Sequence, residues 1–351
     1  MRSLLWPRIV LIIVCLAPVA TAQEVYEREK GMFVTEEITA SIPVKPDAKV
    51  LIASAIHLSG KLTITATEGD SLRIVYAKVA KASNRSQAID FIDLISVVLE
   101  GRPDAPSVKL RSPNPAPWSG TNHSGRVDAE IFAPSGAEIE IAAQTFDVTV
   151  RGPLRALYIP ESLGRLDIAG ITERLNVSTA NRRVILSDIS GKISAATTNS
   201  SLIAESITSL NGQARFRNDG GDMRIDGFVG SINARNGFGR TTLKNFEPRG
   251  EGSYIRGVSG PVSVEITRMA EGQLVVTNRQ EDIEISVPDT LSAFYTLSVG
   301  DDGVIEATNF PFTPDLVRRN RLSLQSGDGK VDIRGSIKGK GNIYIRGRTE
   351  D

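Results

Sequence analysis

Short pairs of mostly apolar residues recur every nine residues through the middle of the chain. The two members of a pair are separated by one residue, as on the inward side of a short β-strand, where side chains alternate in direction. The first members are Ile139, Val148, Leu157, Leu166, Leu175, Val184, Ile193 and Leu202, then, after three extra residues, Ala214, Met223, Ile232 and Thr241. Strands at a fixed interval predict one supersecondary unit that is stacked many times.

A longer period of about 18 residues is superimposed on the first. Glycine precedes every second strand, at Gly191, Gly212 and Gly230. Asparagine follows the same strands at Asn181, Asn199, Asn218 and Asn236. Both residue types tolerate left-handed backbone angles, and stacked asparagines can form hydrogen bonds along a ladder. We therefore expect a coil of two strands and two corners, with the four asparagines in register at one corner.

The segments on either side of this periodic region also have the pattern of β structure. Alternating apolar residues predict strands between residues 24 and 80, and the pattern continues less regularly after Pro248. The spacing of Ala88, Ile89 and Ile92 predicts one short helix near residues 86–94. The predicted organisation is a signal peptide at 1–22, an N-terminal β region and cap at 23–136, a regular solenoid core at 137–247, and a C-terminal continuation and cap at 248–351.

Two all-β architectures produce strands at this interval. In an antiparallel meander, tight turns join neighbouring strands. In a β-solenoid, each strand lies parallel to the strand one coil earlier. The spacing of the asparagines and the absence of Asn-Gly turns from most corners favour the solenoid.

Several strand and turn motifs also match a known family. They are Val127–Ile131, Ala133–Ile139, Gly191–Ile193 and Gly230–Ile232, with Ser59–Ile64 and the helical segment Ser86–Leu94 upstream. On these residues the chain resembles the putative-adhesin β-solenoid family (DUF4097-like), a group of exported bacterial proteins with a domain of unknown function. The resemblance covers roughly two-thirds of the chain. It implies a right-handed, single-stranded β-helix with no catalytic residues to carry over, and it offers the adhesin role as a hypothesis.

The first 22 residues have the features of a secretory signal peptide. Arg2 and Arg8 supply a positive start, a short apolar run follows at residues 9–17, and a small-x-small motif ends at Ala22. Cleavage between Ala22 and Gln23 would remove Cys15, the single cysteine, and leave no thiol in the mature chain. Lipidation of Cys15 is the alternative, although Val14 before it is not the small residue that a lipoprotein signal needs.

The composition narrows the possible ligands. The 41 basic and 41 acidic residues cancel, so no overall field directs the protein to nucleic acid or to an anionic membrane. Aromatic residues make up 5% of the chain, which argues against the stacking surfaces of proteins that bind single-stranded nucleic acid.

Candidate catalytic and metal-binding residues are sparse. His57 and His123 are the two histidines and lie far apart in the sequence, so they do not form a zinc motif. The acidic residues of the periodic region are Asp167, Asp188, Asp222 and Asp226, and they occupy different positions within the repeat. Paired carboxylates are needed to cleave a glycosidic bond. The segment Asn218–Asp222 is glycine-rich but occurs once, which fits a corner better than a calcium repeat. We expect no catalytic, metal-binding or cofactor-binding residues.

The outward residues between the inward pairs form two predicted rows. One row carries Thr149, Asp167, Ile185, Ile203, Arg224 and Thr242, and the other carries Glu140, Tyr158, Asn176, Ser194, Arg215 and Asn233. Ile185 and Ile203 would stack on each other beside Arg224. Either they are ordinary surface residues, or they form a partner-contact strip, because clustered exposed apolar side chains often mark a contact.

The sequence therefore predicts an exported, non-enzymatic, adhesin-like β-solenoid with a binding or structural role at the cell envelope. The expected partner is an envelope protein or a surface polymer, with no nucleic acid and no transmembrane segment in the mature chain. The predicted location is the periplasm, the cell surface or the extracellular medium. The first alternative is a periplasmic scaffold or regulatory protein that senses the state of the envelope. The second is a polysaccharide-acting β-helix enzyme.

Overall fold

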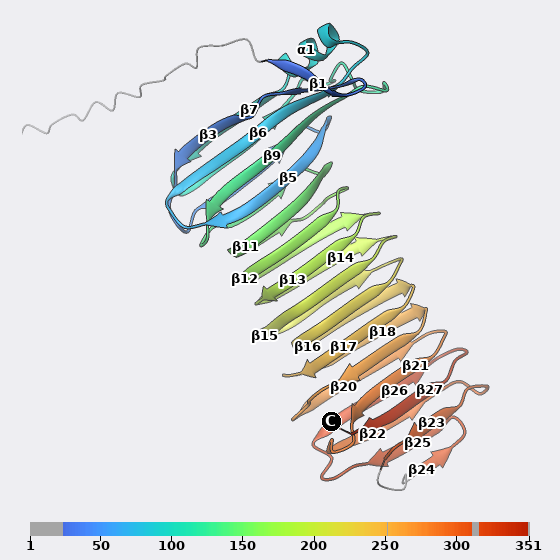
Figure 1. The fold of residues 1–351 in the computed structure, drawn as a ribbon. Helices are drawn as coiled ribbons and strands as arrows, with labels where there is room; N and C mark the ends of the chain where they lie inside the picture. The colour runs from blue at the N-terminus through green and yellow to red at the C-terminus, as the bar shows by residue number, and fades with distance from the viewer. Residues whose placement is uncertain (1–23, 251, 311–315, 350–351) are drawn as a thin grey trace, which may run out of the picture.

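The computed structural model describes residues 24–250, 252–310 and 316–349. The predicted signal peptide, with Cys15 and the Ala22–Gln23 cleavage site, lies outside these residues. The described chain is all-β, with 27 strands and the single helix α1, Arg85–Asp93. Figure 1 shows the strands stacked along one long axis, from the blue amino-terminal part to the red carboxyl-terminal part.

Two ladders of parallel strands run along this axis, and we call them ladder A and ladder B. Ladder A contains, in spatial order, β9 (Ser124–Pro134), β5 (Leu58–Thr67), β11 (Phe146–Ile159), β12 (Leu166–Ala180), β13 (Val184–Ser190), β15 (Leu202–Asn218), β16 (Met223–Phe238), β17 (Thr241–Pro248), β19 (Val262–Ile266), β21 (Ile283–Pro288), β27 (Ile343–Arg348) and β23 (Ile305–Thr308).

Ladder B contains the remaining parallel strands. They are β8 (Ala105–Arg111), β4 (Lys49–Ser54), β10 (Glu138–Ala142), the second halves of β11 and β12, β14 (Lys192–Thr198), the second halves of β15 and β16, β18 (Ser253–Ser259), β20 (Gly272–Asn278), β26 (Val331–Ile337) and β22 (Ala293–Ser298). The long strands bend between their halves and so belong to both ladders.

The parallel pairing has the period that the sequence predicts. Ile139 pairs with Leu157, and Val148 pairs with Leu166, in both cases with the residue 18 positions later. The extra residues after Leu202 lie between Ser209 and Gln213, where the register of β15 against β16 shifts. They are Leu210, Asn211 and Gly212, which form an insertion at one corner of the coil.

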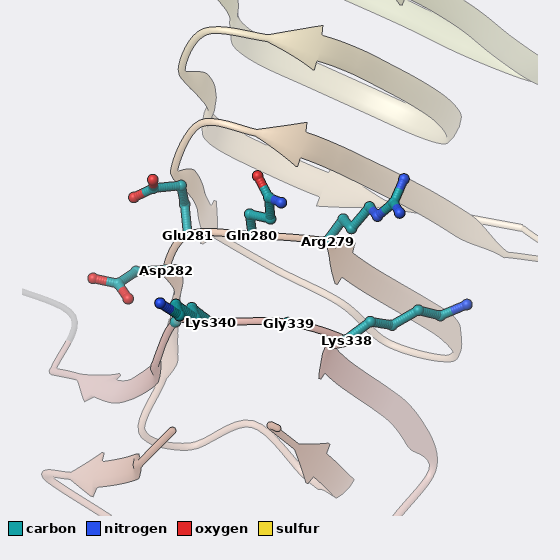
Figure 2. Close-up of a pocket in the computed structure, with 8 residues that line it drawn as sticks. Arg279, Gln280, Glu281, Asp282, Lys338, Gly339 and Lys340 are labelled. Atoms are coloured by element: carbon teal, nitrogen blue, oxygen red, sulfur yellow. The ribbon is translucent and has the colours of Figure 1, made fainter. Parts of the chain in front are cut away.

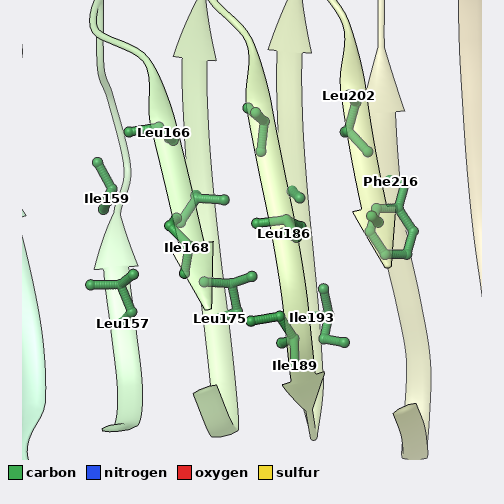
Figure 3. Close-up of a cluster of buried hydrophobic side chains, with 14 of the residues drawn as sticks. Leu157, Ile159, Leu166, Ile168, Leu175, Leu186, Ile189, Ile193, Leu202 and Phe216 are labelled. Atoms are coloured by element: carbon green, nitrogen blue, oxygen red, sulfur yellow. The ribbon is translucent and has the colours of Figure 1, made fainter. Parts of the chain in front are cut away.

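The core lies between the two ladders and is one continuous cluster of buried side chains. Figure 3 shows its middle part, where Leu166 and Ile168 of ladder A face the same interior as Leu157 and Leu175 of ladder B. Burial of apolar surface contributes roughly 25 cal/mol per Å². Because a coil in a stack contacts the coils directly before and after it, this contribution depends on its neighbours being in place.

A third buried row runs along the stack and was not predicted. Its members follow a bend in each coil. Leu154, Ile171, Ile189, Ile207 and Phe228 pair in register, as do Phe246 and Ile266, and the rings of Phe228 and Phe246 are in contact. The residue before most of them has a positive φ, as at Gly170, Asp188, Ser206, Gly227 and Asn245. A left-handed residue reverses the local direction of the chain, which turns the next side chain inward. Phe228 contacts Phe216 and Phe246, with ring centroids 6.1 and 5.8 Å away.

The predicted asparagine ladder is correct for two members and wrong for the other two. Asn181 and Asn199 lie at exposed corners with φ near 60° and 53°, and the Asn199 Nδ2 donates to the Asn181 Oδ1 at 2.8 Å. Asn218 pairs instead with Thr197, so it belongs to a buried row two positions earlier. The three inserted residues keep the interval between Asn199 and Asn218 close to 18, so the intervals between asparagines do not reveal that Asn218 occupies a different row.

The buried asparagines close corners from the inside. The Asn218 Nδ2 donates to the backbone oxygen of Gly221 at 2.9 Å. The Asn236 Nδ2 lies 3.1 to 3.2 Å from the backbone oxygens of Gly221, Gly239 and Arg240. These side chains supply donors to the carbonyl groups of the turns, and the Arg240 oxygen also accepts from the Met223 backbone N–H at 2.9 Å. A buried carbonyl group without a donor would be costly.

The amino-terminal end of the stack is closed by antiparallel strands and the helix. The added strands are β1 (Val25–Glu29), β2 (Met32–Thr35), β3 (Ile38–Pro43), β6 (Ser71–Lys81) and β7 (Ser96–Arg102). Strand β6 pairs antiparallel with β9, and β7 pairs antiparallel with β8. The helix is confirmed within one residue of its predicted bounds. Its N-cap is Asn84, whose side chain accepts from the Gln87 backbone N–H at 2.9 Å.

The carboxyl-terminal strands do not follow the order of the sequence. In ladder B, β26 lies between β20 and β22, and in ladder A, β27 lies between β21 and β23. The coil that the chain forms last is thus inserted inside the stack. Strands β25 (Arg321–Gln325) and β24 (Leu316–Arg318) then extend ladder B in antiparallel orientation.

Tyr295 next to the inserted coil provides a test of the packing. Its side chain is fully buried, and its hydroxyl has no hydrogen-bond partner among the described residues. Burial raises the pKa of Tyr295. Tyr295→Phe is expected to raise the free energy of unfolding by about 1 kcal/mol at neutral pH, because it removes an unpaired polar group.

The same substitution is expected to change the alkaline limb of the stability profile. Above pH of about 10 an unfolded tyrosine loses its proton, whereas folded Tyr295 keeps it, so the free energy of unfolding falls as pH rises. Tyr295→Phe should make that fall shallower in urea unfolding between neutral and alkaline pH. Tyr254→Phe on the outer surface is the control. Equal pH slopes for the wild type and Tyr295→Phe would contradict the assignment.

Candidate functional site

The predicted contact strip lies on the outward surface of ladder A, which we call face A. Ile185 pairs with Ile203, and Ile203 pairs with Arg224, so the three residues occupy one row on three successive strands. The row continues to Asp167 on one side and to Thr242 on the other. Both isoleucines are half-buried and Arg224 is exposed. The register therefore matches the predicted row, and the two apolar side chains are partly accessible.

Ion pairs surround this strip and fix the charged side chains. The Arg224 guanidinium lies 3.3 Å from the Asp226 carboxylate, which also accepts from the Asn245 Nδ2 at 2.8 Å. The Asp167 carboxylate lies 2.9 Å from the Arg151 guanidinium. A groove of about 810 Å³ begins at Ile185 and extends over β12 and β11 toward Lys61. The strip is thus one end of a longer depression on face A.

The outward surface of ladder B, which we call face B, carries the second predicted row. Its residues pair in sequence from Tyr158 through Asn176, Ser194 and Arg215 to Asn233. A groove of about 380 Å³ follows this row from Tyr158 to Arg215. The inserted residues Asn211 and Gly212 line it, and Leu210 beside them is 58% exposed. The insertion therefore forms a wall of the groove on face B.

Another groove lies where the inserted carboxyl-terminal coil crosses an earlier corner. Figure 2 shows Arg279 and Lys338 pointing to one side of this crossing, and Glu281 and Asp282 to the other. Two backbone hydrogen bonds of 2.9 Å join the corners, from the Gly339 N–H to the Arg279 oxygen and from the Glu281 N–H to the Lys340 oxygen. The backbone pairing of the inserted coil accounts for the shape of this groove.

The two histidines belong to the amino-terminal cap. The His57 Nε2 lies 3.3 Å from the Asn114 Oδ1, and the backbone oxygen of His57 accepts from the indole of buried Trp118 at 2.8 Å. The His123 ring packs against Phe91, with centroids 5.8 Å apart. Both histidines thus have structural contacts. Within the described ranges, no cluster of three or more His, Cys, Asp or Glu side chains could hold a metal ion.

The predicted carboxylates are not brought together as a catalytic pair. Asp188 occupies a bend with φ of 53°, whereas Asp226 lies on the outward row that precedes the bends. The Asp222 carboxylate accepts from the Arg240 backbone N–H at 2.9 Å and so supports a corner. Within Asn218–Asp222, the Asn218 side chain caps the turn, as expected for a corner.

In the part of the chain that the structure describes, we find no helix with the length and apolar character needed to span a bilayer.

Comparisons with known proteins give similarities at the level of solved structures. No family model and no curated protein matches the chain. A "putative cell adhesion protein" from Clostridium sporogenes is 11% identical, with a TM-score of 0.22, over 89% of this chain and 100% of its own. A "putative adhesin" from Parabacteroides merdae is 9% identical, with a TM-score of 0.27, over 88% and 95%. A "putative lipid binding protein" from Parabacteroides distasonis is 9% identical, with a TM-score of 0.28, over 88% and 96%.

Proposed function

We propose that this chain is an exported, non-enzymatic, adhesin-like β-solenoid protein with a binding or structural role at the cell envelope. In this proposal, residues 1–22 are the signal peptide, 23–136 and 248–351 contain the caps, and 137–247 form a right-handed coil of the putative-adhesin type. The mature protein would act in the periplasm, at the cell surface or in the medium.

One observation carries the proposal: the parallel register places equivalent outward side chains in rows along the stack. Glu140, Tyr158 and Asn176 form part of one row, and Asp167, Ile185 and Ile203 form part of the other. Neighbouring strands are about 4.8 Å apart, so each row presents side chains at a short, regular spacing. Such a surface suits an extended partner better than a small substrate.

The non-enzymatic part of the proposal is supported by how the carboxylates are used. The carboxylates of Asp167 and Asp226 are engaged in ion pairs, and that of Asp222 holds a corner. A glycosidase needs one carboxyl group that is free to give a proton and a second across the scissile bond. These three carboxylates are engaged within the coil instead, and the fourth candidate, Asp188, lies apart from them at a bend.

The strip formed by Ile185, Ile203 and Arg224 is the proposed contact with a protein partner on face A. Ile185 lies at the end of a groove, Ile203 is paired with it on the next strand, and Arg224 is paired with Ile203 in turn. Apolar patches with a polar rim are typical of protein interaction sites.

Ile185→Asp combined with Ile203→Asp is expected to weaken binding of the mature protein to purified envelope fragments by about tenfold or more, because it replaces apolar contact area with two charges. Cosedimentation with the fragments measures this. Thr242→Asp with Ser263→Asp is the matched control, since these residues continue the same row beyond Arg224 and do not line the groove. Circular dichroism establishes that both variants fold. A folded isoleucine variant that binds like the wild type would remove the strip from the proposal.

A further inference from the structure

Face B has an uneven charge over five successive levels of the stack. The strand segments there are Arg174–Ala180, Lys192–Thr198, Gln213–Asn218, Ser231–Asn236 and Ser253–Gly257. Together they contain six cations and no acidic residue: Arg174, Lys192, Arg215, Arg217, Arg235 and Arg256. In a chain with equal numbers of acidic and basic residues, this concentration of positive charge is a local feature of face B.

The strands of face A at the same levels carry more acids than cations. The segments Leu166–Ile171, Val184–Ser190, Leu202–Ser209, Met223–Gly230 and Thr241–Pro248 contain five acidic residues, Asp167, Asp188, Glu205, Asp226 and Glu247, and two cations, Arg224 and Lys244. Further cations, Arg182 and Arg183, line the groove of face A at a corner before β13. Three of these acids are held in ion pairs, with the Glu247–Arg249 pair at 2.7 Å added to those of Asp167 and Asp226. Face A therefore presents charges of both signs, many of them paired, whereas the face B segments present cations with no acidic residue among them.

The cations of face B are largely unneutralised by the protein. Of the six face B cations, Arg217 forms an ion pair within the described residues 24–250, 252–310 and 316–349. Its partner is Asp219, at 2.9 Å. The Arg174 guanidinium donates to the Tyr158 hydroxyl at 3.0 Å, which leaves its charge uncompensated. The side chains of Lys192, Arg215, Arg235 and Arg256 are exposed.

Three of these arginines are stacked directly on one another. Arg217 pairs with Arg235, and Arg235 pairs with Arg256 on the next strand. Like charges at directly paired positions of a sheet destabilise it, at a spacing of about 4.8 Å. Asp219 offsets the charge of Arg217, so the uncompensated repulsion lies mainly between Arg235 and Arg256. The free protein carries this unfavourable ladder on its surface, and bound anions at the same spacing would relieve it.

Neutral polar groups lie between the cations. Asn176, Ser194 and Asn233 occupy the same outward row as Arg215, with Tyr158 on the strand before Asn176 and Tyr254 on the strand after Asn233. Amide and hydroxyl groups can donate to and accept from sugar hydroxyls, and a tyrosine ring offers an apolar face. The groove bounded by the Leu210–Gly212 insertion holds Arg174, Lys192 and Arg215 beside these groups.

We propose that face B binds a linear anionic polysaccharide that lies along the axis of the stack, from the groove at Arg174 to Arg256. This inference rests on the proposed function and names its ligand. An extended pyranose chain advances by a distance similar to one strand spacing for each ring, so its acidic groups can meet cations on successive strands. A second copy of this chain fits less well, because its face A has few free acids to offer. Single-stranded nucleic acid fits less well, because its successive bases need a series of aromatic side chains to stack on. This row offers two, Tyr158 and Tyr254, on widely separated strands.

The test uses the mature protein and polygalacturonate at low ionic strength, with isothermal titration calorimetry as the measurement. Binding is expected and should weaken as salt is added, because exposed charges are screened. Fully methyl-esterified polygalacturonate, with the same backbone and no charge, should not bind. Arg215→Gln with Arg235→Gln and Arg256→Gln is expected to weaken binding about tenfold or more. The same variant should unfold at an equal or higher temperature than the wild type, because it removes like-charge repulsion.

The matched control removes three cations from face A, through Arg183→Gln, Arg224→Gln and Lys244→Gln, and should bind polygalacturonate within about twofold of the wild type. Deletion of Leu210–Gly212, which removes the groove wall, should weaken binding without unfolding the protein.

Equal losses in the two triple variants would overturn the assignment to face B. Binding of oligo-dT as tight as that of polygalacturonate at equal charge would overturn the polysaccharide class. Salt-sensitive self-association that the face B variant abolishes would assign the surface to a second copy.

Envelope fragments separate this inference from the proposed function. If the wild type binds the fragments and the face B variant binds them equally well, the polysaccharide inference fails and the proposed function stands. If the wild type binds neither the fragments nor polygalacturonate, both fail.

Discussion

Phe228→Ala is expected to lower the free energy of unfolding by about 4 kcal/mol, the largest effect of any single substitution considered for this protein. Phe228 is fully buried in the third inward row and contacts two other phenylalanines, Phe216 and Phe246. Its removal leaves a cavity in a region where neighbouring strands are held by the ladders and cannot move inward. Urea or guanidinium unfolding, followed by circular dichroism, measures the change.

Phe238→Ala provides the control on the same strand, β16. Phe238 is 62% exposed, so its truncation should change the free energy of unfolding by about 0.5 kcal/mol or less. Similar losses for the two variants would mean that the third row does not pack as described. Because stacked repeats can unfold in more than one step, the transition is compared by two probes before a single free energy is derived.

Asn236→Ala is expected to lower the free energy of unfolding by about 3 kcal/mol. The Asn236 side chain is buried and donates toward three backbone oxygens, those of Gly221, Gly239 and Arg240. Alanine has no donor to replace it, so the three backbone oxygens lose the polar contact that the buried amide supplies. The same unfolding experiment measures the loss.

Asn233→Ala tests whether that loss comes from the interior position. Asn233 lies on the same strand, points outward and donates to the Gln213 side chain at 3.4 Å. Its replacement should cost about 1 kcal/mol or less. A loss at Asn236 no larger than the loss at Asn233 would contradict the corner-closing role.

Strand content and register were predictable because they depend on local alternation. The apolar pairs at Leu166 and Val184 are enough to place β12 and β13 at an 18-residue offset. The third inward row was missed because each coil contributes a single apolar residue to it, after a bend. Its signal is a small or flexible residue directly before that apolar residue, as in Gly227–Phe228 and Asn245–Phe246.

The burial of Asn218 was missed for a different reason. Asn181 and Asn199 precede the next inward strand residue by three positions, whereas Asn218 and Asn236 precede it by five. The Leu210–Gly212 insertion adds three residues between Asn199 and Asn218, which masks this difference when the intervals between the asparagines alone are counted.

The outward rows of both candidate surfaces followed from the period, but the charge segregation of face B did not. The net charge does not reveal this segregation, because acidic residues elsewhere in the chain balance the cations of face B. The three arginines Arg217, Arg235 and Arg256 also lie 18 and 21 residues apart, so they form no basic run in the sequence. Only the pairing of strands shows that they stand on one another.

The placement of β26 and β27 inside the stack has a consequence for biosynthesis. Strands β22 and β23 are synthesised before β26 and β27. However, β26 joins β22 to β20, and β27 joins β23 to β21. Vectorial folding can therefore proceed from the amino end to β21 and must then wait for the final coil. Until that coil arrives, four strand edges are open, and open edges recruit other chains. A nascent chain would need protection from aggregation during this interval, and proteolytic loss of the last coil would split the stack instead of shortening it.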